Sequence, residues 1–196
     1  MAAELPYATR KRVPGGDPPQ AAGVDPPLSV EIGLDLLAAR LNRREGPALV
    51  LADAPALREA ALRRIEGTEH EAGRSEDRPA PRVLWLGPGE PPWRLTAAGG
   101  CLGALLPGPM AGLFDRLRGD PPRRAADPRP PAGFTLEACE GIGGPVTALY
   151  ALLAQAAERA GRGDLADRFA FAHRRSLAPR PSTRLAELIV LLARRA

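Results

Sequence analysis

Apolar residues along the chain alternate between short continuous runs and helical spacing, and this pattern predicts an α/β fold. Ser29 is a suitable N-cap for a first helix that carries leucines at 34, 37 and 41 on one face. A compact apolar run after Pro47 predicts a strand buried on both faces, and a second helix follows over 55–65. Residues 82–86 form another buried run, so the two strands should pair in parallel through a right-handed crossover.

The rest of the chain continues this alternation and is expected to end in helices. Residues 101–106 are a possible third strand that Gly103 weakens, and 110–117 a short helix. A strand at 134–138 leads through a glycine turn to a helix from Pro145 to Gly161. Two more helices should follow, one capped by Asp164 and a last one over 182–192. The predicted fold class is α/β, with a small, mostly parallel sheet of three to four strands, flanking helices and a helical C-terminal region.

Proline and glycine separate one predicted domain from its loose segments. The chain has 23 prolines and 21 glycines, and the prolines are clustered. Residues 1–27 carry Pro-Pro pairs and the basic triplet 10–12, which predicts a disordered arm. Residues 28–196 should form a single domain with mobile loops at 67–81 and 118–132. The second loop is an extended basic linker that holds four arginines and five prolines.

Charge and cysteine content restrict the possible partners only loosely. The net charge is +4, and Lys11 is the only lysine among 27 basic residues. This balance is compatible with nucleic-acid contact but gives it little support, so a protein partner is the main expectation. Cys101 and Cys139 have no metal-ligand spacing, and nothing indicates secretion. Because the apolar runs are far shorter than a membrane span, we expect no membrane contact and a cytoplasmic protein, or a nuclear one in a eukaryotic or viral source.

Side chains that could carry chemistry are scarce. His70 lies in a predicted loop and His173 stands alone in a predicted helix, so we expect no metal site and no cofactor. Cys139, at the mouth of the glycine turn, would act as a nucleophile only beside a base such as His173, and a small buried cysteine is the simpler interpretation. No catalytic residue is predicted.

Three loops at predicted strand ends are the candidates for ligand binding, because ligands of doubly wound sheets bind at the carboxyl ends of the strands. Backbone N–H groups at the glycine turn could also hold a phosphate, although no Lys or Ser/Thr follows as in a Walker motif. The candidate residues are Asp53, Gly87, Gly89, Glu90, Glu140, Gly141, Gly143, Gly144 and Thr147.

Two functions fit this sequence. In the first, the chain is a non-catalytic binding or assembly protein that engages a protein partner through its helical C-terminal half and its Arg/Pro-rich segments. Its partner-binding candidates lie on the last predicted helix: Leu185, Leu188, Ile189 and Leu192. In the second, the chain is a small nucleotide- or phosphate-ester-binding enzyme of doubly wound type that uses the loops at Asp53, 87–90 and 141–144. We favour the binding protein because the sequence shows no polar cluster of catalytic type.

Overall fold

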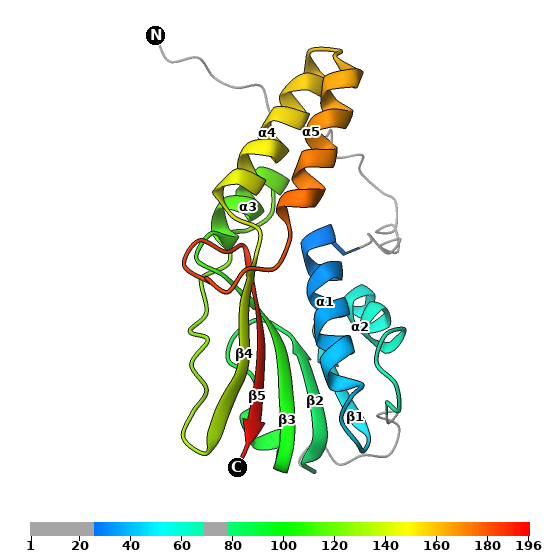
Figure 1. Cartoon of the computed structure of the whole chain (residues 1–196), viewed down its shortest axis with the longest axis vertical. Coiled ribbons are helices and arrows are strands. Elements are labelled where there is room, and N and C mark those ends of the chain that lie inside the picture. The colour runs from blue at the N-terminus through cyan, green and yellow to red at the C-terminus, as the bar shows by residue number, and fades with distance from the viewer. Residues whose placement is uncertain (1–25, 69–77) are drawn as a thin grey trace, which may run out of the picture.

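The computed structural model describes residues 26–68 and 78–196, in which a five-stranded sheet carries two helices against one face and a helical hairpin beyond one end (Figure 1). The elements in chain order are α1 (Leu28–Leu41), β1 (Ala48–Ala52), α2 (Pro55–Leu62), β2 (Ala80–Leu86), the short 3₁₀ helix η1 (Trp93–Leu95), β3 (Thr96–Pro107), α3 (Ala111–Arg118), β4 (Phe134–Ile142), α4 (Pro145–Arg159), α5 (Gly163–Ser176) and β5 (Leu188–Arg195). Residues 1–25 of the predicted arm and 69–77 of the first predicted loop lie outside the described residues.

The sheet has the strand order β1-β2-β3-β5-β4. β1, β2 and β3 pair in parallel, whereas β5 runs antiparallel to both β3 and β4. The predicted α/β class is therefore confirmed. The prediction of a mostly parallel sheet of three to four strands is wrong, because β5 adds a fifth strand and makes two of the four pairings antiparallel.

β5 replaces the last predicted helix, so the C-terminal region is only partly helical. Leucines at 185, 188 and 192 do match helical spacing, but the run from Leu188 to Ala193 is continuously apolar. Each of its six residues is at most 4% exposed. Such a run suits a central strand that is covered on both faces and paired along both edges. The tertiary environment therefore outweighs the helical spacing.

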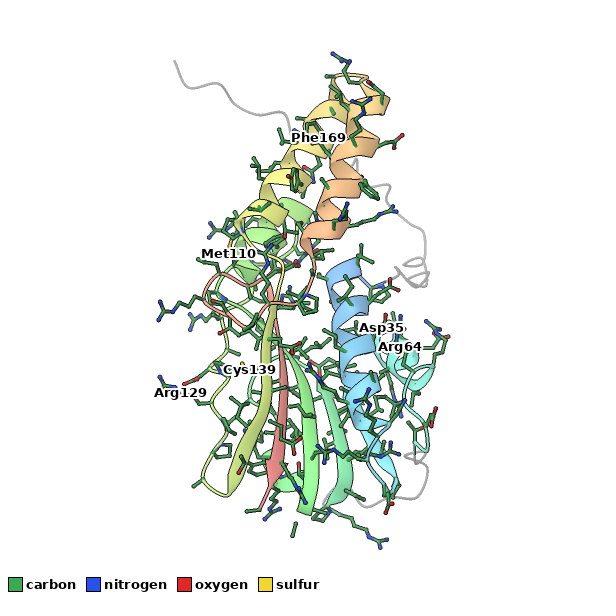
Figure 2. The ribbon with its side chains drawn as sticks, in the orientation of Figure 1. Asp35, Arg64, Met110, Arg129, Cys139 and Phe169 are labelled. Atoms are coloured by element: carbon green, nitrogen blue, oxygen red, sulfur yellow. The ribbon has the colours of Figure 1, made fainter. Side chains whose placement is uncertain are left out.

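Each face of the sheet has its own hydrophobic core. On the first face, Leu34, Leu37 and Leu41 of α1 pack with residues of β1, β2, β3 and β5. α1 is also tied to the end of α2, because Arg64 Nε lies 2.6 Å from Asp35 Oδ1 (Figure 2). Gly103 does not interrupt β3: a Cβ there would lie only 3.0 Å from Leu37 Cδ2, so the glycine lets α1 lie close to the sheet.

The second face packs around Val83, Leu102 and Ile189, all almost fully buried. Trp93 of η1 and Phe134 at the start of β4 pack against this core, and their rings meet edge to face at 5.0 Å.

α4 and α5 form an antiparallel hairpin that extends away from the sheet (Figure 1). Both helices were predicted, from Pro145 and from Asp164. A buried pair of hydroxyl groups joins them near the base of the hairpin: Thr147 Oγ1 donates to the Ser176 carbonyl at 3.2 Å, and Ser176 Oγ donates to Thr147 Oγ1 at 2.9 Å. Within the described residues, no helix combines the length and the apolar character that crossing a membrane requires.

Candidate functional site

Two of the three predicted ligand loops meet at one cavity. The loops after β1 and β2 are neighbours because these strands are adjacent and parallel, so their carboxyl ends lie at the same edge of the sheet. Asp53 from the first loop and Gly87, Gly89 and Glu90 from the second all line the cavity, whose volume is about 920 Å³. Small-molecule sites usually measure roughly 300–1,000 Å³, so this cavity has the capacity for a ligand of substantial size.

The cavity is lined largely by apolar side chains. They come from both helices on the first face, from η1 and from the ends of three strands: Val30, Leu57, Leu86, Trp93, Leu105 and Leu188. The carboxylates of Asp53 and Glu90 belong to exposed residues at its rim. An apolar lining with a few polar groups at the rim is typical of sites for organic ligands.

Residues 120–131, here called the strap, supply another wall of the cavity, with Arg123, Arg124 and Asp127 among them. This segment falls within the predicted mobile linker, yet it is fastened to the body at two points. The Arg123 N–H donates to Asp115 Oδ2 at 2.8 Å, and the Ala126 N–H donates to the Pro107 carbonyl at 2.9 Å. The arginine-rich segment therefore lies against the sheet in the described structure.

Asp115 of α3 is the main anchor of the strap. Its side chain is only 2% exposed and receives the Arg123 guanidinium at 2.7 Å and the Arg118 guanidinium at 3.0 Å. Burial alone would raise the pKa of Asp115, but the hydrogen bonds from Arg123 and Arg118 outweigh it and hold the pKa below its ordinary value. Asp115 is thus an ionised carboxylate whose role is to hold two arginines in place.

Arg118 extends this ion-pair network to the start of β5. Its Nη1 lies 2.6 Å from Oε1 of Glu187, a buried carboxylate that also accepts a hydrogen bond from Ser29 Oγ at 3.2 Å. Burial lowers the pKa of Arg118, but the bond to Glu187 more than compensates and raises it overall. The network therefore links α1, α3, the strap and the segment before β5.

The third predicted loop, at residues 141–144, is not among the residues that line this cavity. A Cβ at Gly141 would come 2.6 Å from the Ser182 carbonyl, and one at Gly143, whose φ is +71°, would come 3.0 Å from Glu187 Cβ. Gly141 also exchanges two backbone hydrogen bonds with Arg180. These glycines therefore make room for the returning segment 180–187, and we assign them a structural role.

Two further ligand candidates are engaged elsewhere. Thr147 is fully buried and its hydroxyl bonds Ser176 at the base of the hairpin. Glu140 pairs with Arg40 of α1 on the first face of the sheet. Neither residue lines the cavity.

The four predicted partner-binding residues do not form a common surface. Leu188, Ile189 and Leu192 are 2%, 1% and 4% exposed within β5, and Leu185 alone is exposed, in the segment before it. The expectation of an exposed helical face at these positions is wrong, because residues 188–192 belong to the buried strand β5 and not to a helix.

A row of exposed apolar side chains lies instead on α4, and Phe171 of α5 is exposed on the same hairpin. Val146, Leu149 and Leu152 are 46%, 53% and 45% exposed, and Ala156 continues the row one turn further along. We call these four residues the α4 stripe. The sequence predicted this helix, but it could not show that the hairpin leaves the sheet and so exposes these side chains.

The possible catalytic and metal-binding side chains gain no support. Burial raises the pKa of the Cys139 thiol, which is the reverse of what an activated nucleophile needs. Cys101 is buried, and burial raises its pKa as well. Over residues 26–68 and 78–196, no group of three or more His, Cys, Asp or Glu side chains could hold a metal ion. His70 lies outside these residues.

Comparison of the chain with protein-family models and with curated proteins finds no match. Its functional interpretation therefore depends on the geometry of the cavity and of the hairpin.

Proposed function

We propose that this chain is a non-catalytic binding protein that engages another protein through the α4 stripe. The observation that carries the proposal is the exposure of Val146, Leu149 and Leu152, each close to half, on a hairpin that stands away from the sheet. Apolar side chains gathered on one exposed surface are typical of protein interaction sites. A cytoplasmic location agrees with this role and stays a prediction.

The spacing of the α4 stripe suits a helical partner. Positions 146, 149, 152 and 156 follow one another at intervals of three and four residues, so they cover one side of α4. A helix that packs against such a row inserts its own apolar ridge between these side chains. We therefore infer that the partner contributes an amphipathic helix, which would turn the two-helix hairpin into a three-helix contact.

The Arg/Pro-rich part of the original hypothesis is changed by this proposal. The strap is fastened by Asp115 and contributes to the cavity, so we assign it to ligand binding and not to the protein partner. The basic triplet 10–12 lies outside the described residues. Of the alternative function, a small nucleotide- or phosphate-ester-binding enzyme, we retain only ligand binding, because the described residues that line the cavity include no nucleophile paired with a base.

Exchanging Leu149 and Leu152 together for glutamate should abolish partner binding. Affinity capture from cells of the source organism would identify the candidate, and titration of the purified partner by calorimetry would then measure its Kd. We expect a loss of at least about 30-fold, since altering a hot-spot residue at the centre of an interface costs about 2 kcal/mol or more.

The matched control adds two glutamates outside the α4 stripe, at the exposed positions Ala160 and Ala178. It changes the net charge equally, and it should leave the Kd within about twofold. Circular dichroism would verify that both variants retain their helices. A captured protein that binds the L149E/L152E variant as well as it binds the control would contradict the proposal. So would self-association of the purified chain through the same stripe, because the partner would then be a second copy.

A further inference from the structure

The cavity beneath the strap is a candidate for a second binding site, separate from the α4 stripe. It lies at the carboxyl ends of β1 and β2, whereas the α4 stripe lies on the hairpin beyond the sheet. A ligand here would not have to compete with the protein partner. The chemistry of its lining divides into three parts, and each part restricts the class of ligand.

The first part is the apolar lining, formed by residues such as Leu57, Leu86 and Trp93. Burying a flat organic ring against these side chains would remove its apolar surface from water, at about 25 cal/mol per Å². An inorganic ion alone would leave this surface unused. The ligand should therefore have an apolar or aromatic body.

The second part is the pair of carboxylates on the loops after β1 and β2. Asp53 and Glu90 are exposed at the rim. An ionised carboxylate only accepts hydrogen bonds, so the part of the ligand that reaches this rim should donate them. Sugar hydroxyl groups are suitable donors, and an acidic side chain beyond a strand end is a usual partner for a ribose in doubly wound sheets.

The third part is the basic wall on the strap. Arg123 already bonds Asp115, while Arg124 makes no ion pair with any residue in the described ranges. Arg129 also lines the cavity but is less suited to hold an anion there, because its side chain is 89% exposed and its Nε lies 3.9 Å from the Asp127 carboxylate. The guanidinium of Arg124 is thus available for an anion, and a planar guanidinium binds phosphate oxygens in a bidentate manner.

We propose that this cavity binds a nucleoside phosphate, with the base on the apolar lining, the sugar hydroxyls at Asp53 and Glu90, and the phosphate at Arg124. This arrangement differs from a glycine-loop phosphate site. Residue 55, at the first position of α2, is a proline and has no N–H to offer, so the start of that helix is a poor phosphate cradle. The strap supplies the positive charge instead.

Binding can be measured by calorimetry on the full chain with adenosine, guanosine, cytidine and uridine monophosphates. Arg124→Ala should reduce the affinity for the monophosphate that binds best about tenfold, while the affinity for its parent nucleoside changes less than twofold. Arg162→Ala serves as the control, because Arg162 is an exposed arginine at the start of α5, on the hairpin. This variant should bind both compounds as the unaltered chain does.

The donor end of the ligand has its own test. Changing Asp53 to Asn together with Glu90 to Gln should weaken binding of the nucleotide and of the nucleoside about tenfold. The same change should leave the 2′,3′-dideoxy analogue within twofold, because that analogue lacks the hydroxyl groups the carboxylates accept from.

A measurement on the unaltered chain protects the test against variants that fold poorly. Photolysis with the 8-azido derivative of adenosine or guanosine monophosphate, whichever binds better, should label a peptide that contains residues 86–93 or 123–127. The proposal would be overturned if none of the four monophosphates binds at millimolar concentration, if inorganic phosphate binds as well as the nucleotides, or if Arg124→Ala weakens nucleoside and nucleotide equally. Preferential binding of an amino acid or dipeptide would also overturn it.

Discussion

Replacing Leu191 with alanine should lower the free energy of unfolding by about 3–4 kcal/mol. Leu191 is fully buried in β5, where it pairs with Ala104 of β3 and Cys139 of β4. Truncating a leucine in such a position removes its transfer free energy and leaves a cavity, and such changes cost roughly 3–5 kcal/mol. Because folded domains are stable by only about 5–15 kcal/mol, the loss should be plain in urea denaturation monitored by circular dichroism.

Leu152→Ala is the matched control for Leu191→Ala. The chemical change is identical, but Leu152 is 45% exposed on α4, so we expect a loss of less than about 1 kcal/mol. Equal losses for the two variants would mean that β5 is not buried between β3 and β4. The control also serves the partner experiment, because it shows that the α4 stripe can be altered without unfolding the domain.

Asp115→Asn should have the second-largest effect and should act on the strap. The change removes the negative charge that Arg118 and Arg123 share, and we expect a loss of about 3 kcal/mol in the free energy of unfolding. This figure is at the low end for a broken buried ion pair, because Arg118 and Arg123 are partly exposed, at 29% and 41%. Hydrogen exchange should show faster exchange of the Arg123 and Ala126 amides, which fasten the strap.

The control for Asp115→Asn is Asp127→Asn, since Asp127 is 70% exposed and lies 3.9 Å from Arg129. We expect it to change the stability by no more than about 0.5 kcal/mol. If Asp115→Asn destabilises the chain no more than this control does, the Asp115 network does not hold the strap.

The same carboxylate should make the stability depend on acid pH. Its pKa in the folded chain lies below the ordinary value of 3.8, so the unfolded chain binds the proton more readily. The stability contributed by Asp115 is therefore fully present above that value and is lost as the pH falls through the lower folded pKa. The difference in unfolding free energy between the unaltered chain and Asp115→Asn should shrink below about pH 4 in urea titrations. A difference that stays constant down to pH 2 would contradict this assignment.

Local sequence patterns were sufficient for the first half of the fold. Continuous apolar runs and helical spacing correctly predicted β1, α2 and β2, and proline at the start of α4 marked that helix. These elements are either separated by clear turn residues or long enough to show their period. The convergence of Asp53 with residues 87–90 followed from the parallel pairing of β1 and β2.

Long-range packing decided the features that the sequence left open. The run at 188–193 is apolar at every position, so its periodicity cannot distinguish a strand from a buried helix. The run becomes a strand because it pairs with β3 on one side and with β4 on the other. The strap could not be placed because its two anchors, the pairing of Arg123 with Asp115 and the hydrogen bond from Ala126 to Pro107, have no local sequence signature. The exposure of the α4 stripe likewise could not be predicted, because it depends on the absence of any covering segment in the described structure.

The position of β5 also constrains the order in which the protein can be completed during synthesis. β3 and β4 leave the ribosome well before residues 188–195. Until β5 has been made, β3 and β4 each have one strand edge without a partner. Unpaired apolar strand edges recruit other strands and lead to aggregation. A nascent chain that stalls before residue 188 should therefore depend on chaperones, because the sheet can close only after β5 has been synthesised.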